Sequence, residues 1–308
     1  MSNTLRVIQH NVAKQGPIQE SLINDSEIEN AAVLAIQEPQ ARIIKGRLLT
    51  TPMGHSKWTK MVPATYAEGR WAIRSMLWVR NDLDAEQLPI ESPDMTAALL
   101  RLPDRLILMF SVYVQGSEER ALRESCDTLR RVITETRRSA GRVVDVVIAG
   151  DFNRHDQLWG GEDVVPERYG EADRIVALMN EFALSSLLQR GTKTWHRGVH
   201  ESTIDLVLVS EELADSVISC KTLASNHGSD HEAIDTVFDT SVPERKIPER
   251  LLLKNAPWNE INRRVAAALG TDPIEGTVQQ QTDRLMSVVL EAMHALTPKA
   301  KPCPHAKR

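Results

Sequence analysis

The sequence predicts a mixed α/β sandwich, in which two packed sheets are flanked by helices. Many short apolar segments have the length of strands, and only a few amphipathic segments have the spacing of helices. The 308-residue chain is 42% hydrophobic, which is enough for a sizeable core. A sheet must bury one face and a helix one stripe, so many strands with few helices favour two stacked sheets with helices outside.

The first part of the chain predicts five strands and one helix. The segments "LRVIQHNV" (5–12) and "AVLAIQE" (32–38) resemble buried strands, and the stretch between them can hold a helix. Residues 71–80, 95–103 and 105–114 follow as further strands. The dipeptide "PD" separates the last two, which is typical of a hairpin.

The middle of the chain alternates between helices and strands. Residues 118–138 carry apolar residues at helical spacing and end at Gly141, and residues 171–184 predict a second amphipathic helix. Between these two helices lies the apolar strand 143–150. The strands expected after them are "SSLLQ", "KTWHRG", "STIDLVLVS" (202–210), "VISCKTL" and "EAIDTVFDT".

The composition changes near residue 241 and indicates a domain boundary. Residues 241–256 are rich in proline and charge, which is typical of a linker. Helices are expected over 258–269 and 277–296, and the end "TPKAKPCPHAKR" is basic and interrupted by prolines. We therefore expect a main domain over 1–240, a linker over 241–256 and a helical C-terminal extension over 257–308.

Charge and composition exclude several classes of protein. The net charge of -5 argues against a strongly basic nucleic-acid-binding coat but leaves room for a local basic groove. The three cysteines have no spacing typical of a metal site or a disulfide framework. The N-terminus lacks the pattern of a signal peptide and no run is long enough to span a bilayer, so we expect an intracellular protein without a membrane partner.

Polar residues that bind metals or move protons lie at the ends of several expected strands. Each alone has a simpler structural explanation, such as a turn at "GDFN", a cap at "SDH" or a solvated strand end before Pro39. Together they predict a catalytic edge, since α/β folds place chemistry at strand ends. The residues are Asn11, Glu38, Tyr113, Asp151, Asn153, Asp205, Ser229, Asp230 and His231.

Asp205 indicates the chemistry most clearly. A carboxylate inside an apolar strand must be paired, and His231 follows one short strand later. An Asp–His pair orients the imidazole and stabilises its charged form. Glu38 offers the hard oxygen ligand that Mg²⁺ or Mn²⁺ prefers, and no Cys/His spacing suggests zinc. The set favours metal-assisted hydrolysis of a phosphoester.

The order of these motifs resembles a known superfamily. The segments "IQHNV", "AIQEP", "SVY", "IAGDFN", "STIDLVLVS" and "GSDHEAI" span residues 5 to 237. They resemble the landmarks of the endonuclease/exonuclease/phosphatase superfamily, the group of DNase I and exonuclease III. The sequences of these motifs are most similar to those of the apurinic-type endonuclease domain of non-LTR retrotransposon polyproteins. This resemblance implies a four-layer α/β/β/α sandwich, and the basic tail resembles the segment that joins such domains to a reverse transcriptase.

The resemblance also implies a role for each site residue. Glu38 would be the main Mg²⁺ ligand with Asn11 beside it, and Asp230 would support the metal or His231. His231, oriented by Asp205, would act on the scissile phosphate as a general base or charge stabiliser. Asp151 would position or deprotonate the attacking water, Asn153 would hydrogen-bond the developing charge, and Tyr113 would contact phosphate or the leaving oxygen. Ser229 and Thr203 are the candidate substrate-binding residues.

Two departures from the family pattern bear on the substrate. Members that act on abasic sites usually carry an acidic residue where this chain has Ala13. They also carry an aromatic residue shortly before the catalytic Asp, where this chain has Ser202 and Thr203, with Trp195 further back. Both departures favour nicking of intact duplex DNA over cleavage at abasic sites.

We therefore expect a Mg²⁺-dependent DNA endonuclease that nicks one strand of duplex DNA and leaves a 3′-hydroxyl. The alternatives are an abasic-site endonuclease, another phosphoesterase of the same fold, or an inactive DNA-binding retroelement remnant. A reverse transcriptase domain in a longer parent chain is an expected partner, and the nucleus is the expected location. The candidate contacts to DNA phosphates, which can equally form a solvated charged face, are Arg42, Lys45, Arg47, Lys57 and Lys60.

Overall fold

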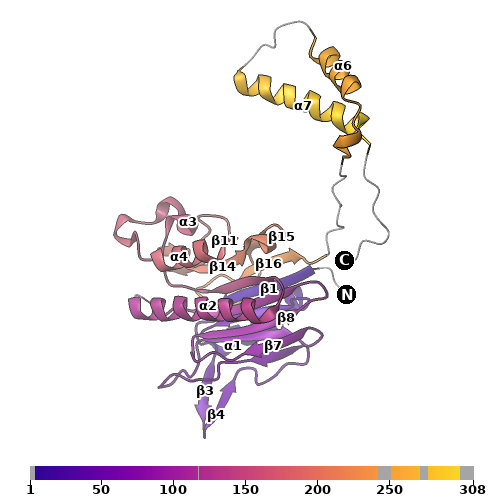
Figure 1. Cartoon of the computed structure of the whole chain (residues 1–308). Helices are drawn as coiled ribbons and strands as arrows, with labels where there is room; N and C mark the ends of the chain where they lie inside the picture. Colours follow the sequence, from indigo (N-terminus) through magenta and orange to yellow (C-terminus); the bar gives the residue numbers. More distant parts are fainter. Residues whose placement is uncertain (1–3, 117, 242–250, 271–276, 299–308) are drawn as a thin grey trace. The chain divides into compact units, whose positions relative to one another are not determined.

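The computed structural model describes residues 4–116, 118–241, 251–270 and 277–298 (Figure 1). The chain divides into two compact units, Met1–Val242 and Pro243–Arg308. Most of the expected linker, residues 242–250, and the basic tail from residue 299 lie outside the described residues. The first unit contains all of the candidate site residues.

The described strands form two six-stranded sheets and two short two-stranded ones. The order in the first large sheet is β15-β16-β1-β2-β6-β5. Its strands are β1 (Thr4–Asn11), β2 (Val33–Gln37), β5 (Trp58–Met61), β6 (Ser75–Arg80), β15 (Val217–Thr222) and β16 (Ile234–Asp239). β1 and β2 run parallel and lie in the middle of the sheet, and every residue of β2 is buried. Burial on both faces explains the unbroken apolar run of β2.

The second large sheet has the order β11-β14-β10-β9-β8-β7. Its strands are β7 (Asp84–Leu88), β8 (Met95–Arg101), β9 (Leu106–Tyr113), β10 (Val144–Asp151), β11 (Leu184–Ser186) and β14 (Asp205–Ser210). β9 and β10 are parallel and are joined by α2 (Glu119–Ala140), as a parallel pair requires a crossover connection. Gly141 ends α2 in the left-handed conformation with φ 65°, as its sequence position predicted.

The core lies in three layers between and outside the sheets. Residues such as Val7 and Leu77 of the first sheet pack against Met109 and Val207 of the second. The outer face of the first sheet is covered by α1 (Gly16–Ile23). The outer face of the second is covered by α2, which runs along it in Figure 1, and by α4 (Asp173–Phe182). The predicted sandwich of two sheets flanked by helices is therefore confirmed.

Shorter elements connect the layers. The ribbon β3–β4 (Ala41–Ile44 and Arg47–Thr50) projects from the body in Figure 1, and the hairpin β12–β13 (Trp195–Arg197 and His200–Ser202) precedes β14. The sequence did not predict β3, β4, β5 or β7. The remaining short helices of this unit are α3 (Gln157–Gly160), α5 (Glu211–Ala214), η1 (Ser26–Ile28), η2 (Gly161–Asp163) and η3 (Pro166–Arg168).

The single strand expected over 202–210 is wrong, because the chain breaks at Thr203 and Ile204 into β13 and β14. The Thr203 hydroxyl donates to the Thr192 carbonyl at 2.6 Å. The Ile204 and Asp205 amides both donate to the Thr194 hydroxyl at 3.1 Å. These side-chain bonds replace ladder bonds at the break.

The second unit contains η4 (Leu253–Asn255), α6 (Trp258–Leu269) and α7 (Val278–Leu296). The helices expected over 258–269 and 277–296 are present, and they pack against each other. Thr277 begins α7 with a capping box, in which its side chain and that of Gln280 each accept a backbone hydrogen bond from the other residue. None of the helices in the described parts of the chain is long and apolar enough to cross a bilayer.

Candidate active site

The site lies where the ends of both sheets meet. Tyr113, Asp151 and Asp205 are register partners across β9, β10 and β14, so they form one row at the edge of the second sheet. Asn11 ends β1 in the facing sheet, and Glu38 follows β2 directly. The topology therefore collects five residues that are far apart in the sequence.

Gly150 has a packing role immediately before this row. A Cβ at this position would lie 2.1 Å from the Val112 carbonyl oxygen of β9. Glycine is needed because β9 and β10 approach each other closely here. This close approach brings Asp151 beside Tyr113.

The expected Asp205–His231 pair forms in the structure. His231 Nδ1 lies 2.9 Å from Asp205 Oδ2, and both side chains are buried. The other oxygen of Asp205 accepts a hydrogen bond from Gln9 Nε2 at 2.9 Å. The carboxylate is thus held from two sides, which fixes the plane in which the imidazole lies.

Asp151 is surrounded by amide donors. Asn11 Nδ2 donates to its Oδ2 at 2.9 Å, and Asn153 Nδ2 donates to the same oxygen at 3.1 Å. The Asn153 backbone amide donates to Oδ1 at 3.0 Å. Asn153 adopts φ 49°, a left-handed conformation that asparagine tolerates better than most residues. His231 Nε2 lies 4.0 Å from Asp151 Oδ2, on the side away from Asp205.

The electrostatics of this cluster are those of two buried carboxylates and one imidazole. Burial and the repulsion of Asp205 raise the pKa of Asp151 well above its usual range. Burial lowers the tendency of His231 to carry charge, but Asp205 and Asp151 outweigh it and raise its pKa to about 9. At neutral pH His231 is therefore an imidazolium, and its charge favours the ionised forms of Asp205 and Asp151.

Glu38 and Tyr113 form a second group beside this cluster. Glu38 is paired with the Lys14 ammonium, and Tyr113 donates a hydrogen bond to the Glu38 carboxylate. Burial and the charges of Glu38 and Asp151 raise the pKa of Tyr113, so its hydroxyl keeps its proton at neutral pH. The Arg74 guanidinium lies over the Tyr113 ring, 5.6 Å from its centre.

The residues of the last motif have different surroundings. The Ser229 hydroxyl donates to the Asn11 carbonyl at 2.7 Å and accepts from the His231 amide at 3.2 Å, so it ties the loop to the end of β1. Asp230 is exposed and accepts a hydrogen bond from Trp195 Nε1 at 3.2 Å. Thr203 is buried, and its hydroxyl is used at the break before β14.

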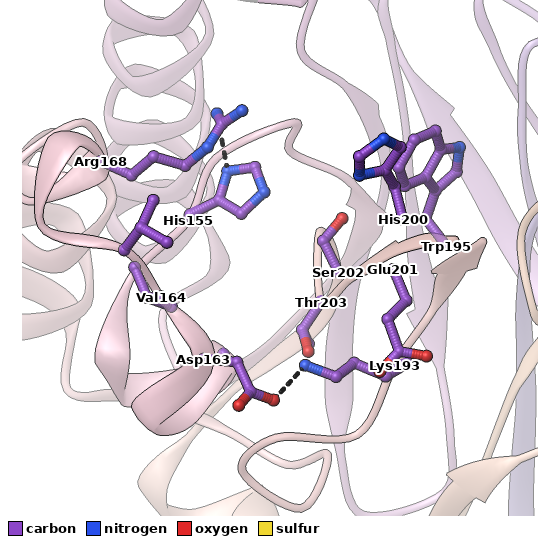
Figure 2. A pocket seen from close by; sticks show the side chains of 12 residues that line it. His155, Asp163, Val164, Arg168, Lys193, Trp195, His200, Glu201, Ser202 and Thr203 are labelled. Atoms are coloured by element: carbon purple, nitrogen blue, oxygen red, sulfur yellow. Dashed lines mark hydrogen bonds and ion pairs between the residues drawn. The ribbon is translucent and has the colours of Figure 1, made fainter. Parts of the chain in front are cut away.

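Two adjoining cavities share lining residues, among them Trp195 and Ser202 of the β12–β13 hairpin. One, of about 370 Å³, is lined by the β12–β13 hairpin and by residues of the segment 155–168, and Figure 2 shows its lining side chains. The second, of about 420 Å³, is lined by Asn153, Trp195, Ser202 and Ile204 among others. Trp195 and Ser202 are register partners in the hairpin. The pairing brings an aromatic side chain next to the stretch where the sequence lacks one.

Sequence reasoning missed Gln9 and Gln37, which support the site from the first sheet. Both are fully buried. Gln9 Nε2 donates to Gln37 Oε1 at 2.8 Å, and Gln37 Nε2 donates to the Ser111 hydroxyl at 2.9 Å. Two buried amides in one sheet facing Asp205 in the other form a polar bridge across the core. Polar residues inside the apolar segments 5–12 and 32–38 were the signal that could have identified them.

The structure also bears on where a divalent cation would bind. Among the described residues, Asp151, Asp205 and His231 form a group whose possible ligand atoms lie within 4.8 Å of one another. The expected ligands were instead Glu38, Asn11 and Asp230. Glu38 already holds a cation, the Lys14 ammonium, and Asp151 has a raised pKa that a nearby cation would relieve. Carboxylate oxygens suit Mg²⁺ or Mn²⁺, so the donor set between these two groups fits a divalent metal.

Comparisons with known proteins agree with this geometry. The family model described as "Endonuclease-reverse transcriptase" matches residues 107–235, from β9 into β16. No curated protein matches the chain by sequence.

Solved structures share the fold at low identity. The endonuclease domain of TRAS1, a telomere-specific non-LTR retrotransposon, superposes with a TM-score of 0.61 at 19% identity, covering 76% of this chain and 98% of that one. An AP endonuclease from Leishmania major gives 0.64 at 15% identity, covering 77% and 88%. An endonuclease/exonuclease/phosphatase family protein from Leptotrichia buccalis gives 0.53 at 11%, covering 75% and 98%. The family match over residues 107–235 and these likenesses show that this chain shares the fold of these endonucleases.

Proposed function

We propose that this chain is a metal-dependent DNA endonuclease that nicks one strand of a duplex and leaves a 3′-hydroxyl. The observation that carries the proposal is the buried arrangement of Asp205, His231 and Asp151, with His231 between the two carboxylates. The family description and the two endonucleases of the same fold support a nuclease. A retrotransposon endonuclease that leaves a 3′-hydroxyl would supply the primer for a reverse transcriptase in a longer parent protein.

In the proposed reaction, Asp151, Tyr113 and His231 each have a separate role. Asp151 accepts a proton from the attacking water when it is ionised, and its raised pKa makes this carboxylate a stronger base than an ordinary aspartate. The water oxygen forms a bond to phosphorus while the bond from phosphorus to the 3′-oxygen breaks, and the leaving 3′-oxygen takes a proton from solvent to become the 3′-hydroxyl. Tyr113, which keeps its proton, donates a hydrogen bond to the leaving oxygen or the phosphate. His231 acts as a charged stabiliser of the phosphate, because its pKa of about 9 leaves it protonated.

Asn153 and the metal complete the electrostatic stabilisation. Asn153 borders the second cavity and donates to Asp151, so its amide stands beside the reacting phosphate. Mg²⁺ or Mn²⁺ held by Glu38, with Asn11 and Asp151 nearby, would act as a Lewis acid on the phosphate oxygens. Loss of the metal should therefore abolish nicking while leaving the fold intact.

End analysis of the product tests the proposed chemistry. Wild-type protein is incubated with a labelled duplex and Mg²⁺, and the nicked product is offered to a DNA polymerase without phosphatase treatment. Direct extension from the nick supports cleavage of the bond to the 3′-oxygen. Products that extend only after removal of a 3′-phosphate would contradict this assignment.

A second candidate, cleavage at abasic sites, is favoured by one observation. Trp195 lies opposite Ser202 and lines the cavity that Asn153 also lines, so an aromatic wall is present despite its absence before Asp205 in the sequence. A comparison of initial rates on an intact duplex and on the same duplex with one tetrahydrofuran abasic analogue separates the two. Trp195→Ala should lower the rate selectively on the abasic duplex if this candidate is correct.

A further inference from the structure

We propose that the β3–β4 ribbon is the surface through which this chain holds the phosphate backbone of its DNA beside the catalytic residues. This inference rests on the proposed function, since it assigns the DNA contact for the same site. Three observations carry it: the charge of the segment, the freedom of its cations and its place next to Glu38.

The segment is basic in an acidic protein. Residues 39–67 contain five lysines and arginines and no aspartate or glutamate, although the whole chain has 42 acidic residues against 37 lysines and arginines. The ribbon itself carries three of these cations: Arg42, Lys45 and Arg47. A concentration of unopposed positive charge on one projecting element is the electrostatic pattern of a nucleic-acid contact.

The five lysines and arginines of residues 39–67 differ in whether they already form an ion pair or hydrogen bonds in the structure. Lys57 is paired with Glu29 at 2.5 Å. Lys60 is partly buried and donates to the Thr50 hydroxyl and the Met53 carbonyl, each at 2.8 Å. Within the described residues, the three ribbon cations form no ion pair with a carboxylate. Of the five candidate contacts in the sequence, therefore, only the three on the ribbon are available to a phosphate.

A neighbouring segment adds a fourth cation. The Arg42 and Arg70 guanidiniums lie 5.2 and 5.0 Å from the centre of the same Trp71 ring. The Ala72 amide donates to the Ala41 carbonyl, so this segment is anchored to the base of the ribbon. Two like charges held on one indole repel each other, and an anion between them would offset that repulsion.

The form of the ribbon also suits a duplex. β3 and β4 pair only with each other in the described structure, so the ribbon extends neither large sheet. Its base is buried at Ala41 and Thr50, and its tip is exposed at Ile43 and Ile44. Figure 1 shows the ribbon projecting beyond the sheets. A two-stranded β-ribbon fits the major groove of B-DNA, where cations on its edges reach phosphates. Since β3 begins three residues after Glu38, the DNA so held passes the catalytic edge.

The turn at the tip of the ribbon allows a substitution that removes a positive charge without changing the backbone of the turn. Lys45 and Gly46 have φ 51° and 73°, the pattern of a two-residue hairpin turn in which asparagine is strongly preferred at the first position. Lys45→Asn thus removes the charge and preserves the turn. Combined with Arg47→Gln, it removes two exposed charges.

The matched control is Arg101→Gln with Arg131→Gln, which removes two exposed charges that are already ion-paired. Arg101 pairs with Leu106, at the opposite end of the second sheet from Tyr113.

The test is equilibrium binding of a labelled 30-base-pair duplex in EDTA, between 50 and 200 mM salt. Each lost phosphate contact lowers the slope of log K against log salt by about 0.9, so the ribbon variant should lose about 2 from the slope. Its affinity at 100 mM salt should fall by at least about 10-fold, while the control variant stays close to wild type. A ribbon variant with the slope and affinity of the control would overturn the proposal. Absence of any DNA binding by the wild-type protein would overturn it as well.

Hydrolysis of a small diester, bis(4-nitrophenyl) phosphate, separates this proposal from the proposed function. The ribbon variant should hydrolyse it at the wild-type rate and yet nick plasmid more slowly. If the wild-type protein nicks plasmid and the ribbon variant does so equally well at every salt concentration, the ribbon assignment is wrong and the endonuclease stands. If the wild-type protein neither nicks DNA nor hydrolyses the diester with Mg²⁺, the catalytic proposal fails, and the binding experiment alone decides the ribbon.

Discussion

Asp151 and Asp205 lie directly opposite each other in the antiparallel pairing of β10 with β14. Like charges at opposed positions destabilise a sheet, and these two are also fully buried. His231 offsets the repulsion, since its imidazolium contacts Asp205 at 2.9 Å and approaches Asp151 at 4.0 Å. The arrangement therefore lowers the stability of the sheet, but it places charged groups where a phosphate or a metal would bind.

Asp151→Asn should lower the nicking rate by at least about 10³-fold, because the amide cannot accept the proton of the attacking water. The fold should persist, since the asparagine is isosteric and removes one of the two opposed charges. Single-turnover nicking assays measure the rate, and urea unfolding measures the stability. A rate within 10-fold of wild type would exclude Asp151 as the base.

Gln9→Leu should lower the rate by about 10- to 100-fold without loss of DNA binding. The substitution leaves Asp205 Oδ1 without its donor, and a buried hydrogen bond to a charged group contributes about 1.5–3 kcal/mol. The lost bond should also change the pH at which activity falls, because His231 depends on the charge of Asp205. Gln19→Leu is the matched control: Gln19 is equally buried but bonds to Met76 and Gln40 rather than to Asp205. Equal effects of the two variants on rate and pH profile would mean that Gln9 has only a packing role.

Glu38→Gln should raise the Mg²⁺ concentration needed for half-maximal nicking by at least about 10-fold, since a neutral amide binds a hard cation more weakly than a carboxylate. Titration of the initial rate with Mg²⁺ measures the change. Glu29→Gln, which removes an equal charge from an exposed ion pair with Lys57, should leave the titration unchanged. An unaltered midpoint in Glu38→Gln would remove this residue from the metal site.

His10 should make the protein sensitive to acid. Burial lowers its pKa to about 4, while in the unfolded chain it titrates near its ordinary value of 6.5. Below about pH 6.5 the unfolded state binds a proton that the folded state does not, so this contribution to stability is present above that pH and is lost as the pH falls towards 4. Between pH 7 and pH 5 the loss is about 2 kcal/mol.

His10→Gln isolates this effect, because glutamine does not titrate and can still donate to the His231 carbonyl, as His10 Nε2 does at 3.1 Å. Urea unfolding of both proteins at pH 7 and pH 5 gives the comparison. The variant should lose about 2 kcal/mol less than wild type on acidification. Equal losses in the two proteins would show that His10 is not held neutral by its burial.

The sequence was sufficient to predict the long elements and the pairing of Asp205 with His231. Apolar runs and helical spacing placed β1, β2, α2 and β10, because these elements bury continuous faces. A carboxylate inside the strand at Asp205 required a partner, and His231 is that partner in the structure. These conclusions needed only local patterns and the cost of burying a charge.

Other features depend on contacts that no local pattern encodes. β3 and β4 are short, charged strands that pair only with each other, so they lack an apolar run. The contact between Trp195 and the stretch before Asp205 depends on the register of the β12–β13 hairpin. Gln9 faces Asp205 only because two separate sheets pack face to face. Such relationships arise from tertiary packing and become visible only in the folded chain.

Nicking of supercoiled plasmid with Mg²⁺, by wild-type protein and by His231→Ala, tests the proposed endonuclease activity most directly. We expect open circles with the wild-type protein and none when EDTA replaces Mg²⁺. The rate should be at least about 10³-fold lower in the variant, because the charge that stabilises the phosphate is gone. Wild-type protein that is folded and does not nick, or a variant that nicks as fast as wild type, would contradict the proposal.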